Sequence, residues 1–411
     1  MMKTIIVLAC LAALATANFS NHKVYRVNPS NKEQLDVVRA FEGIKGVDFW
    51  SKARAVNKEM DIMVSPQIQM RFTDTLKQNS IAHNVLINDV ETVVQREKME
   101  KMMSPRVEAG KINFEQYHTY DTIVEYLIQL ESDHSDIVEV RSIGGTYEDR
   151  EMVMIKISTG GSNKPAILID AGIHAREWIA PATALYFIHE LVENKDNRHM
   201  IENVDWYIIP VLNPDGYEYT HSSTSNRFWR KTTTKGQRCD GVDANRNFDF
   251  HWMEIGASDY ECDETYAGPE GFSESETRNL KNLVESLGSQ TKLYLTFHSY
   301  GQYLLYPWGY TSALPEDVQT LDDLAHDVAD AIYAVDRTDY TIGSSTNVLY
   351  AAAGGSDDWV KAVGGVALSY TIELPGGGWN GFDPPASAIK GVATETFEGL
   401  KVYHAYVEKN F

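Results

Sequence analysis

From residue 166 onward the sequence alternates apolar strand-like runs with stretches of helical character, and this alternation limits the fold more than any other feature. The apolar runs occupy 166–171 (AILIDA), 206–212, 292–298 and 365–374. The helical stretches occupy 177–192, 273–287, 315–335 and 389–407. Pro181 fits the first turn of the first helix, and Ser273 to Glu276 has the sequence of a capping box for the second. Strands that alternate with helices predict an α/β sheet covered by helices on both faces.

Charge is unevenly divided along the 411 residues. Residues 18–106 hold 14 basic and 11 acidic side chains, whereas the chain after Arg106 holds 22 basic and 47 acidic ones, a net of −25. A mildly basic front and a strongly acidic body predict two folding units. The overall net charge of −21 repels phosphate groups and anionic lipid headgroups, which argues against nucleic acids and membrane surfaces as main partners.

The N-terminus has the pattern of a secretory signal peptide, which we predict to span residues 1–17. Lys3 supplies the charge, residues 5–14 the apolar core, and Ala15-Thr16-Ala17 the small residues of a cleavage site. A membrane anchor is the alternative, but about 11 apolar residues are too few for a bilayer core that needs about 20. We therefore expect a secreted chain that begins at Asn18, which is also the first residue of a glycosylation sequon.

Cysteine usage is consistent with secretion. Cys10 leaves with the signal peptide, so Cys239 and Cys262 remain in an oxidising compartment. One disulfide is the natural count, and two free buried thiols are the alternative. A closed loop of about 24 residues would restrict the unfolded chain by about 3 kcal/mol in the loop-entropy treatment.

Residues 89–103 form a highly charged helical stretch that ends before Ser104-Pro105-Arg106. Its apolar content is little more than three valines, so we expect a solvated connecting helix. An exposed Arg106 after such a helix is easily cut by a trypsin-like protease, and Lys101 and Lys111 are other cut sites. An ordinary interdomain linker is the alternative.

His174 and Glu177 lie in the turn after the strand 166–171, three residues apart, so an imidazole and a carboxylate could share one cation. His298 is the candidate third ligand because it lies at the carboxyl end of its own strand, the edge where open α/β sheets place their sites. Two histidines and one glutamate with an open fourth position are typical of catalytic zinc, which activates water and polarises a carbonyl.

The sequence from about Tyr117 to the C-terminus resembles the metallocarboxypeptidase A/B family of zymogens, and the leading segment fits the family's activation domain more loosely. The motifs that carry the resemblance stand at 174–178 (HAREW), 213–217 (NPDGY), 227–231 (RFWRK), 242–248 (VDANRNF), 297–300 (FHSY), 349–350 (LY), 354–359 (GGSDDW) and 370–374 (YTIEL). The resemblance implies a mixed central sheet with helices on both faces at 107–411, preceded by a small α+β ferredoxin-like prodomain at 18–106. It also implies that Cys239 pairs with Cys262.

Catalytic roles follow from the resemblance by position. It implies that His174, Glu177 and His298 bind one Zn²⁺. Glu373 would act as general base and then as general acid, because a carboxylate beside activated water can take its proton and deliver it to the leaving nitrogen. Arg230 would stabilise the tetrahedral oxyanion.

Substrate-binding roles follow in the same way. Asn245 and Arg246 would bind the free C-terminal carboxylate, since a guanidinium donates two hydrogen bonds to it and an amide adds another. Tyr350 would close over the substrate; the alternative is a packing role. Residues that would contact the substrate upstream of the scissile bond are Arg176, Ser299 and Tyr300. Arg176 as a surface charge is the alternative reading of that position.

Asp357 bears on specificity. The family's A-type branch has an apolar pocket floor at this position and its B-type branch has Asp, while small neighbours at Gly309, Ser345 and Gly355 leave room for a long side chain. A buried carboxylate without a partner is costly, so the pocket should favour C-terminal Lys or Arg. The alternative is a solvated loop charge.

Two departures from the family pattern bear on side-chain preference. Ser345 replaces a usual glycine, and residues 374–378 (LPGGG) replace a common Arg-Asp pair.

The sequence therefore predicts a secreted zymogen that, once cut, removes C-terminal Lys and Arg, with digestion of dietary peptides as the role that the resemblance implies. An A-type enzyme for apolar C-termini is the nearest alternative. A non-catalytic binding protein on the same scaffold is the alternative from another class.

Overall fold

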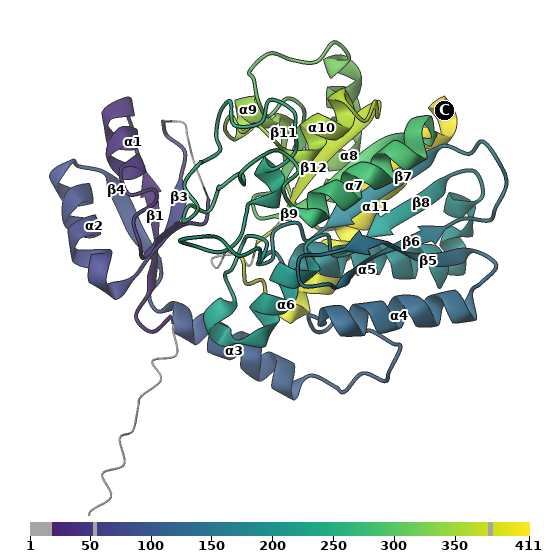
Figure 1. Ribbon diagram of the computed structural model, residues 1–411, viewed down its shortest axis with the longest axis horizontal. Coiled ribbons are helices and arrows are strands. Elements are labelled where there is room, and N and C mark those ends of the chain that lie inside the picture. Colours follow the sequence, from purple (N-terminus) through teal and green to yellow (C-terminus); the bar gives the residue numbers. More distant parts are fainter. Residues whose placement is uncertain (1–18, 52–55, 377–380) are drawn as a thin grey trace, which may run out of the picture.

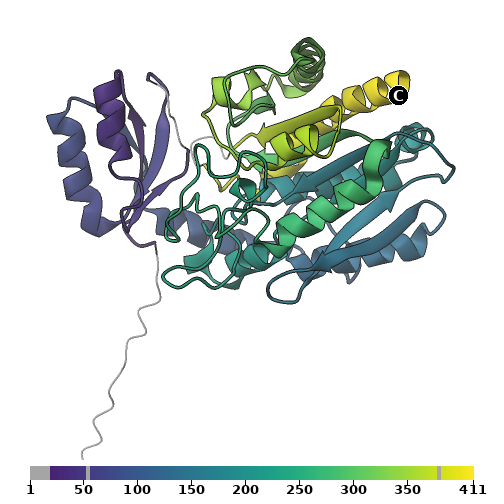
Figure 2. The same cartoon turned by 45° about the horizontal axis from the view of Figure 1, so that its top comes forward.

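The computed structural model describes residues 19–51, 56–376 and 381–411. They form a small N-terminal unit and a larger body, connected by helix α3 (Val90–Met103). The small unit, purple to blue, lies at one end of the body in both views (Figures 1 and 2). The predicted signal peptide and Asn18 fall outside the described residues, and so does part of 374–378.

The N-terminal unit is a four-stranded antiparallel sheet with two helices on one face. Its strands run in the order β2-β3-β1-β4, which with the intervening helices is the predicted ferredoxin-like arrangement. The elements are β1 (Lys23–Asn28), α1 (Lys32–Arg39), β2 (Val47–Phe49), β3 (Met60–Val64), α2 (Pro66–Gln78) and β4 (Ala82–Ile87). Because side chains alternate along a strand, Tyr25 and Val27 pack with the helices, whereas Val24 lies in the cluster that includes Phe228 of the body. The free face of the sheet is therefore turned toward the body.

The body is built on an eight-stranded mixed sheet in the order β11-β10-β12-β9-β7-β8-β6-β5. The four central strands β12, β9, β7 and β8 are parallel to one another. The strands are β5 (Val138–Gly145), β6 (Glu151–Ile157), β7 (Ala166–Ala171), β8 (Asp205–Ile209), β9 (Thr291–Ser299), β10 (Tyr303–Tyr306), β11 (Thr341–Ser344) and β12 (Leu368–Leu374). This confirms the mixed sheet and the four strands that the apolar runs predicted.

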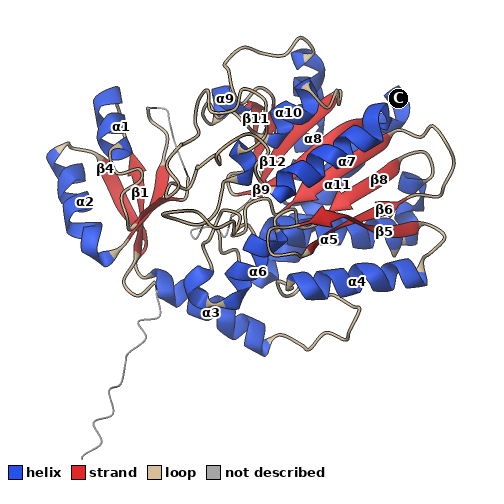
Figure 3. Ribbon diagram, viewed as in Figure 1, coloured by secondary structure: helices blue, strands red, loops and turns tan. Residues whose placement is uncertain are grey.

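Helices cover both faces of this sheet (Figure 3). One face packs against α4 (Tyr120–Asp133), α5 (Ile179–Val192), α8 (Val318–Asp336) and α11 (Ile389–Asn410), and the other against α7 (Ser275–Leu287) and α10 (Ser356–Ala362). Along β7, Ile167 and Ile169 belong to the first core, whereas Ala166 and Leu168 belong to the second. Burial on both sides thus explains a strand that is apolar at five of its six positions.

Two local predictions differ from the structure. The capping box at Ser273 does not form: α7 begins at Ser275, and Ser273 instead hydrogen-bonds Asn247 from a distant loop and the adjacent Glu274. The first helix begins at Ile179 rather than at Glu177, so the segment from His174 to Glu177 stays in the connection after β7. Because the helix begins two residues later than predicted, the side chains of His174 and Glu177 stay at the carboxyl edge of the sheet.

Candidate metal centre and substrate cleft

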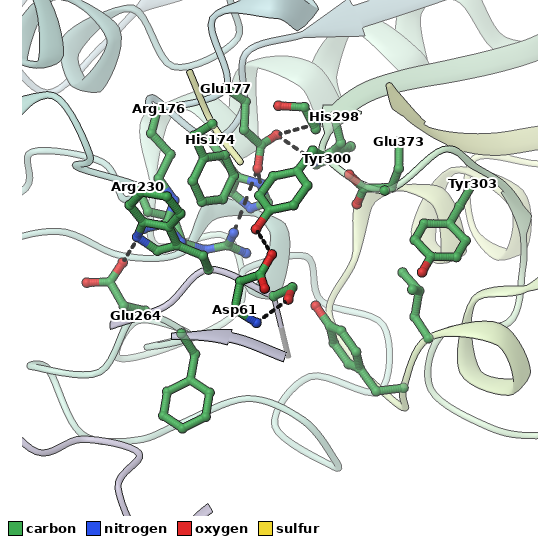
Figure 4. A pocket seen from close by; sticks show the side chains of 18 of the residues that line it. Asp61, His174, Arg176, Glu177, Arg230, Glu264, His298, Tyr300, Tyr303 and Glu373 are labelled. Carbon is green, nitrogen blue, oxygen red and sulfur yellow. Dashed lines mark hydrogen bonds and ion pairs between the residues drawn. The ribbon is translucent and has the colours of Figure 1, made fainter. Parts of the chain in front are cut away.

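Three buried side chains meet at the carboxyl ends of two neighbouring parallel strands. His174 and Glu177 follow β7, and His298 is the penultimate residue of β9. The Nδ1 atom of His174 lies 2.8 Å from Glu177 Oε1 and 3.2 Å from His298 Nδ1, which in turn lies 3.2 Å from Glu177 Oε2. Their exposed fractions are 4%, 2% and 1%. Figure 4 shows the three side chains next to one another.

This donor set fits a zinc ion. Two ligand atoms that each lie about 2.0 to 2.1 Å from a tetrahedral ion are about 3.3 Å apart, close to the separations between the three side chains here. Two ring nitrogens directed at each other cannot both carry protons, so a shared cation is the simplest partner for them. In the described part of the chain, this is the one group of three or more His, Cys, Asp or Glu side chains whose ligand atoms converge within 4.8 Å.

Asp243 joins one of these histidines to a nearby cation. Its Oδ1 lies 3.1 Å from His174 Nε2, and its Oδ2 accepts hydrogen bonds of 2.9 and 3.2 Å from Arg230. Burial alone would raise the pKa of Asp243, but the charges of Arg230 and His174 hold it well below its usual range. An ionised Asp243 therefore fixes the His174 ring and holds Arg230 beside the ligand cluster.

Glu373 lies beside the cluster on the next strand. It pairs with His298 in the parallel register of β12 and β9, so the two side chains leave the sheet at the same level. Its Oε2 is buried and has no hydrogen-bond partner within the described residues, and burial raises the pKa of the Glu373 carboxyl to about 7. A carboxylate with an open lone pair beside the metal ligands is positioned to accept a proton.

Asn245, Arg246 and Tyr350 form the next part of the cleft. Arg246 Nη2 lies 3.4 Å from the Tyr350 hydroxyl, while Arg246 Nη1 donates to Asn245 O at 2.7 Å. The Asn245 amide oxygen accepts from the backbone N–H of Ser356 at 2.9 Å, which orients its NH₂ group. All three side chains line the cavity that also contains the metal ligands.

Asp357 lies at the first turn of α10, in a small adjoining pocket of about 60 Å³. The predicted neighbours Gly309, Ser345 and Gly355 all line this pocket, and Ser345 Oγ lies 3.4 Å from Asp357 Oδ2. No Lys or Arg of the described chain lies within ion-pair distance of Asp357, which is 7% exposed. Burial raises the pKa of the Asp357 carboxyl, so a cation in the pocket would stabilise its charge.

Two prodomain carboxylates accept hydrogen bonds from two of the remaining predicted site residues. Arg176 Nη1 donates to Asp48 at 2.9 Å, and the Tyr300 hydroxyl, turned toward Asp61 in Figure 4, donates to it at 2.8 Å. Arg176 is buried, which contradicts the reading of it as a surface charge. Ser299 lies next to Tyr300, and its backbone N–H donates to Glu177 Oε2. The N-terminal unit and the body thus enclose a shared cavity of about 440 Å³ over the metal ligands.

The contact between the units extends to the connecting helix. Arg227 of the body donates two hydrogen bonds, of 2.7 and 3.0 Å, to Glu97 of α3. Nearby, Trp50 packs on Phe228 and Phe382, with ring centroids 4.7 and 5.5 Å away. The expectation of a fully solvated connecting helix is therefore wrong on this face.

Every residue predicted to act in catalysis or substrate binding lies in this cleft or its adjoining pocket, and the predicted disulfide between Cys239 and Cys262 is present. No role was predicted from the sequence for Asp243, Arg227, Asp48 or Asp61. Asp243 and Arg227 stand inside quoted motifs, which is a usable signal. The prodomain carboxylates carry no local pattern, because their partners lie more than 100 residues away.

Comparison with known proteins agrees with this geometry. Residues 123–399 match the family described as zinc carboxypeptidase, and residues 25–97 match the carboxypeptidase activation peptide. The chain is 49% identical over 299 residues to carboxypeptidase B of Astacus astacus, covering 72% of this chain and 98% of the relative. It is 37% identical over 410 residues to carboxypeptidase B of Homo sapiens, covering 96% of each.

Among solved structures, the carboxypeptidase A of Helicoverpa armigera has a TM-score of 0.88 at 31% identity, over 95% of this chain and 98% of that one. The activation peptide, the hydrolase domain and the ligand cluster thus occur together on one chain. The chain belongs to the zinc carboxypeptidase family, and it is the zymogen of a peptide hydrolase that takes one Zn²⁺.

Proposed function

We propose that this protein is a secreted zymogen that, once cut between its two units, releases Lys and Arg from peptide C-termini. The observation that carries the specificity is Asp357, a buried carboxylate with no cationic partner in the described chain, in a pocket beside Arg246. The charge of a C-terminal Lys or Arg would compensate its burial, whereas an apolar side chain would leave it unpaired. The names of the crayfish and human relatives support the B-type reading.

Recognition of a chain end would rest on Asn245, Arg246 and Tyr350. The guanidinium of Arg246 and the oriented amide of Asn245 offer N–H donors to a terminal carboxylate. The Tyr350 hydroxyl already lies near Arg246, so a small movement of this side chain would cover the bound end. An exopeptidase needs this arrangement because the free carboxylate distinguishes the last residue from all others.

The proposed chemistry uses Glu373 and Arg230 around the ligands His174, Glu177 and His298. When bound, zinc supplies Lewis-acid activation of water and of the scissile carbonyl. Glu373 would take the proton of the attacking water and deliver it to the leaving nitrogen. Arg230, held by Asp243, would stabilise the oxyanion that develops on the carbonyl oxygen.

Activation would follow cleavage of the segment after α3. Residues 104–113 contain no helix or strand, and Arg106 is exposed, so a protease can bind the chain at this residue. Lys111 shares both properties, whereas Lys101 lies in the last turn of α3. We place the prodomain at 18–106, the catalytic domain at 107–411 and the main cut after Arg106. Among the helices of the described residues, none combines the length and the apolar content that a membrane span requires.

The test compares hydrolysis of two peptides that differ only in a C-terminal Arg or Phe. We expect trypsin treatment to raise the activity toward the Arg peptide, a chelator to abolish it, and added zinc to restore it. Asp357→Asn should lower kcat/KM for the Arg peptide by about 30-fold or more, the cost of truncating one partner of a buried charge pair. Asp327→Asn, which removes the same charge from an exposed position on α8, is the matched control.

Each other outcome contradicts one part of the proposal. A wild-type preference for Phe would favour an A-type enzyme. An activated protein without stoichiometric zinc would favour a non-catalytic binding protein. An uncut chain as active as the cut one would contradict activation by cleavage.

A further inference from the structure

Strand β9 presents three polar side chains on one face that lead to the metal centre. Tyr294, Thr296 and His298 are alternate residues of this strand, so their side chains project to the same side of the sheet. Thr296 pairs with Asp170 in the parallel register of β7 and β9. Asp170 is the only polar residue in the apolar run 166–171, and it is fully buried.

These four residues are joined by short contacts. The Thr296 hydroxyl donates to Asp170 Oδ1 at 2.8 Å, and the Tyr294 hydroxyl donates to Asp170 Oδ2. The Thr296 Oγ1 atom also lies 3.2 Å from Nε2 of His298. Nδ1 of the same ring faces Glu177 and His174, so the two ring nitrogens of His298 face different partners.

The direction of each hydrogen bond follows from the chemistry of the groups. Burial raises the pKa of Asp170 to about 6, so its carboxyl is ionised at pH 7.5 and can only accept. The single hydroxyl proton of Thr296 is therefore committed to Asp170, which leaves the Thr296 oxygen as an acceptor. In the neutral ring that a metal ligand requires, His298 then holds its proton on Nε2, and its Nδ1 keeps a lone pair directed at the ligand cluster.

We propose that Asp170 and Thr296 are positioning residues for the metal: they hold His298 in the tautomer and ring orientation that bind zinc through Nδ1. Asp243 makes the corresponding contact to His174, but directly, so each histidine is oriented by a different buried carboxylate. Asp170 acts on His298 through the Thr296 hydroxyl, because the Asp170 carboxylate lies on the neighbouring strand β7. The inference rests on His298 as a zinc ligand of the proposed function.

The experiment measures the zinc dissociation constant of the full chain at pH 7.5 by competition with a chromophoric chelator. Thr296→Val removes the acceptor at nearly constant volume, and we expect it to weaken zinc binding about 10- to 100-fold, as loss of such outer contacts does. Thr296→Ser retains the hydroxyl and should stay within about threefold of the wild type by the same reasoning. Thr291→Val is the matched control, because Thr291 lies on the same strand and its buried hydroxyl has no partner in the described chain.

Asp170→Asn tests the Asp170 side of the same hydrogen-bonded chain. The double variant with Thr296→Val tests whether Asp170 acts through Thr296. If Asp170 acts through Thr296, Asp170→Asn weakens zinc binding in the wild-type chain but has no further effect in the Thr296→Val chain. The visible spectrum of the Co²⁺-loaded forms should shift with Thr296→Val and Asp170→Asn and stay unchanged with Thr291→Val, which a general loss of stability would not produce.

The outcomes separate this inference from the proposed function. A wild-type chain that binds no zinc contradicts the metal site itself. Normal zinc binding by the wild type, together with an unchanged dissociation constant in Thr296→Val, overturns the positioning role alone. A further loss caused by Asp170→Asn in the Thr296→Val chain overturns the route through Thr296. If Thr296→Val does not fold, an unchanged zinc dissociation constant and Co²⁺ spectrum in Asp170→Asn overturn the inference instead.

Discussion

Trp178 contacts two basic side chains in the body of the molecule. The guanidinium carbon of Arg227 lies 3.7 Å from the centre of its ring system, and the His221 ring stacks on it at 4.0 Å with an angle of 2°. Both ring nitrogens of His221 are buried and have no hydrogen-bond partner among the described residues. Burial, with the nearby charges of Lys101 and Arg227, lowers the pKa of His221 well below its ordinary value. The folded zymogen therefore holds this ring neutral.

A neutral histidine with buried ring nitrogens makes stability depend on pH. Below about pH 6.5 the unfolded chain protonates His221 while the folded chain does not, so this residue's contribution is present above that pH and is lost as the pH falls. The loss should approach about 1.4 kcal/mol per pH unit. We expect His221→Phe to reduce the difference in unfolding free energy between pH 7 and pH 5 by up to about 2 kcal/mol, because about 1.5 pH units of that interval lie below pH 6.5. Denaturant unfolding measures it, with His326→Gln at an exposed position as the control.

Among the secondary-structure elements, α3 has two unlike faces. Val90, Val93, Val94 and Glu97 are buried against the rest of the molecule, whereas Glu100 is half-buried and the methionines near the end of the helix are exposed. The buried Glu97 neutralises Arg227, and the half-buried Glu100 lies 3.8 Å from Arg96 on its own helix. Two glutamates on one helix thus differ in whether they join the prodomain to the body.

This difference predicts how firmly the cut prodomain stays bound. Glu97→Gln leaves the Arg227 charge buried without its partner, and we expect it to weaken binding of the cleaved prodomain by about 30-fold or more. Glu100→Gln removes a surface ion pair worth about 0.2 to 1 kcal/mol at most, so its effect should be below about fivefold. Release of the prodomain after trypsin treatment, followed by size-exclusion chromatography, checks both. Equal effects of the two substitutions would show that Glu97 does not join the units.

The elements of the body were predictable because their signals are local. A strand such as 166–171 is apolar except for Asp170, and His174, Glu177 and His298 lie just beyond or at the ends of such strands, where sites form in these sheets. The capping box at Ser273 and the solvated helix at 89–103 were predicted wrongly because distant partners decide their structure. Asn247 hydrogen-bonds the Ser273 hydroxyl, and Arg227 pairs with the Glu97 carboxylate. A sequence read in short windows contains no trace of either pairing.

At the scale of the whole molecule, arginines gather in the cleft of a strongly acidic body. The chain after Arg106 carries a net of −25, and its cleft presents Arg176, Arg230 and Arg246 beside Glu177, Glu264 and Glu373. In the zymogen, Asp48 pairs with Arg176, so acidic groups of a mildly basic prodomain occupy cationic positions of an acidic body. Arginines in the cleft and acidic groups over the rest of the body suit a substrate whose terminal carboxylate enters the cleft while its positive charges face the acidic body.

That arrangement predicts that salt slows the capture of basic peptides. We compare two peptides that both end in Arg, one with several lysines in its body and one without charges there. Raising NaCl from about 10 mM to about 500 mM shortens the screening length from about 30 Å to a few ångströms, so long-range attraction to the acidic body is lost while contacts at Asp357 are largely kept. We expect kcat/KM of the activated enzyme to fall several-fold for the lysine-rich peptide, mainly through KM, and to change little for the other, because steering acts on encounter rather than on the chemical step. Equal salt dependence of the two peptides would remove long-range attraction as a cause, and specificity for basic residues would then rest on Asp357 alone.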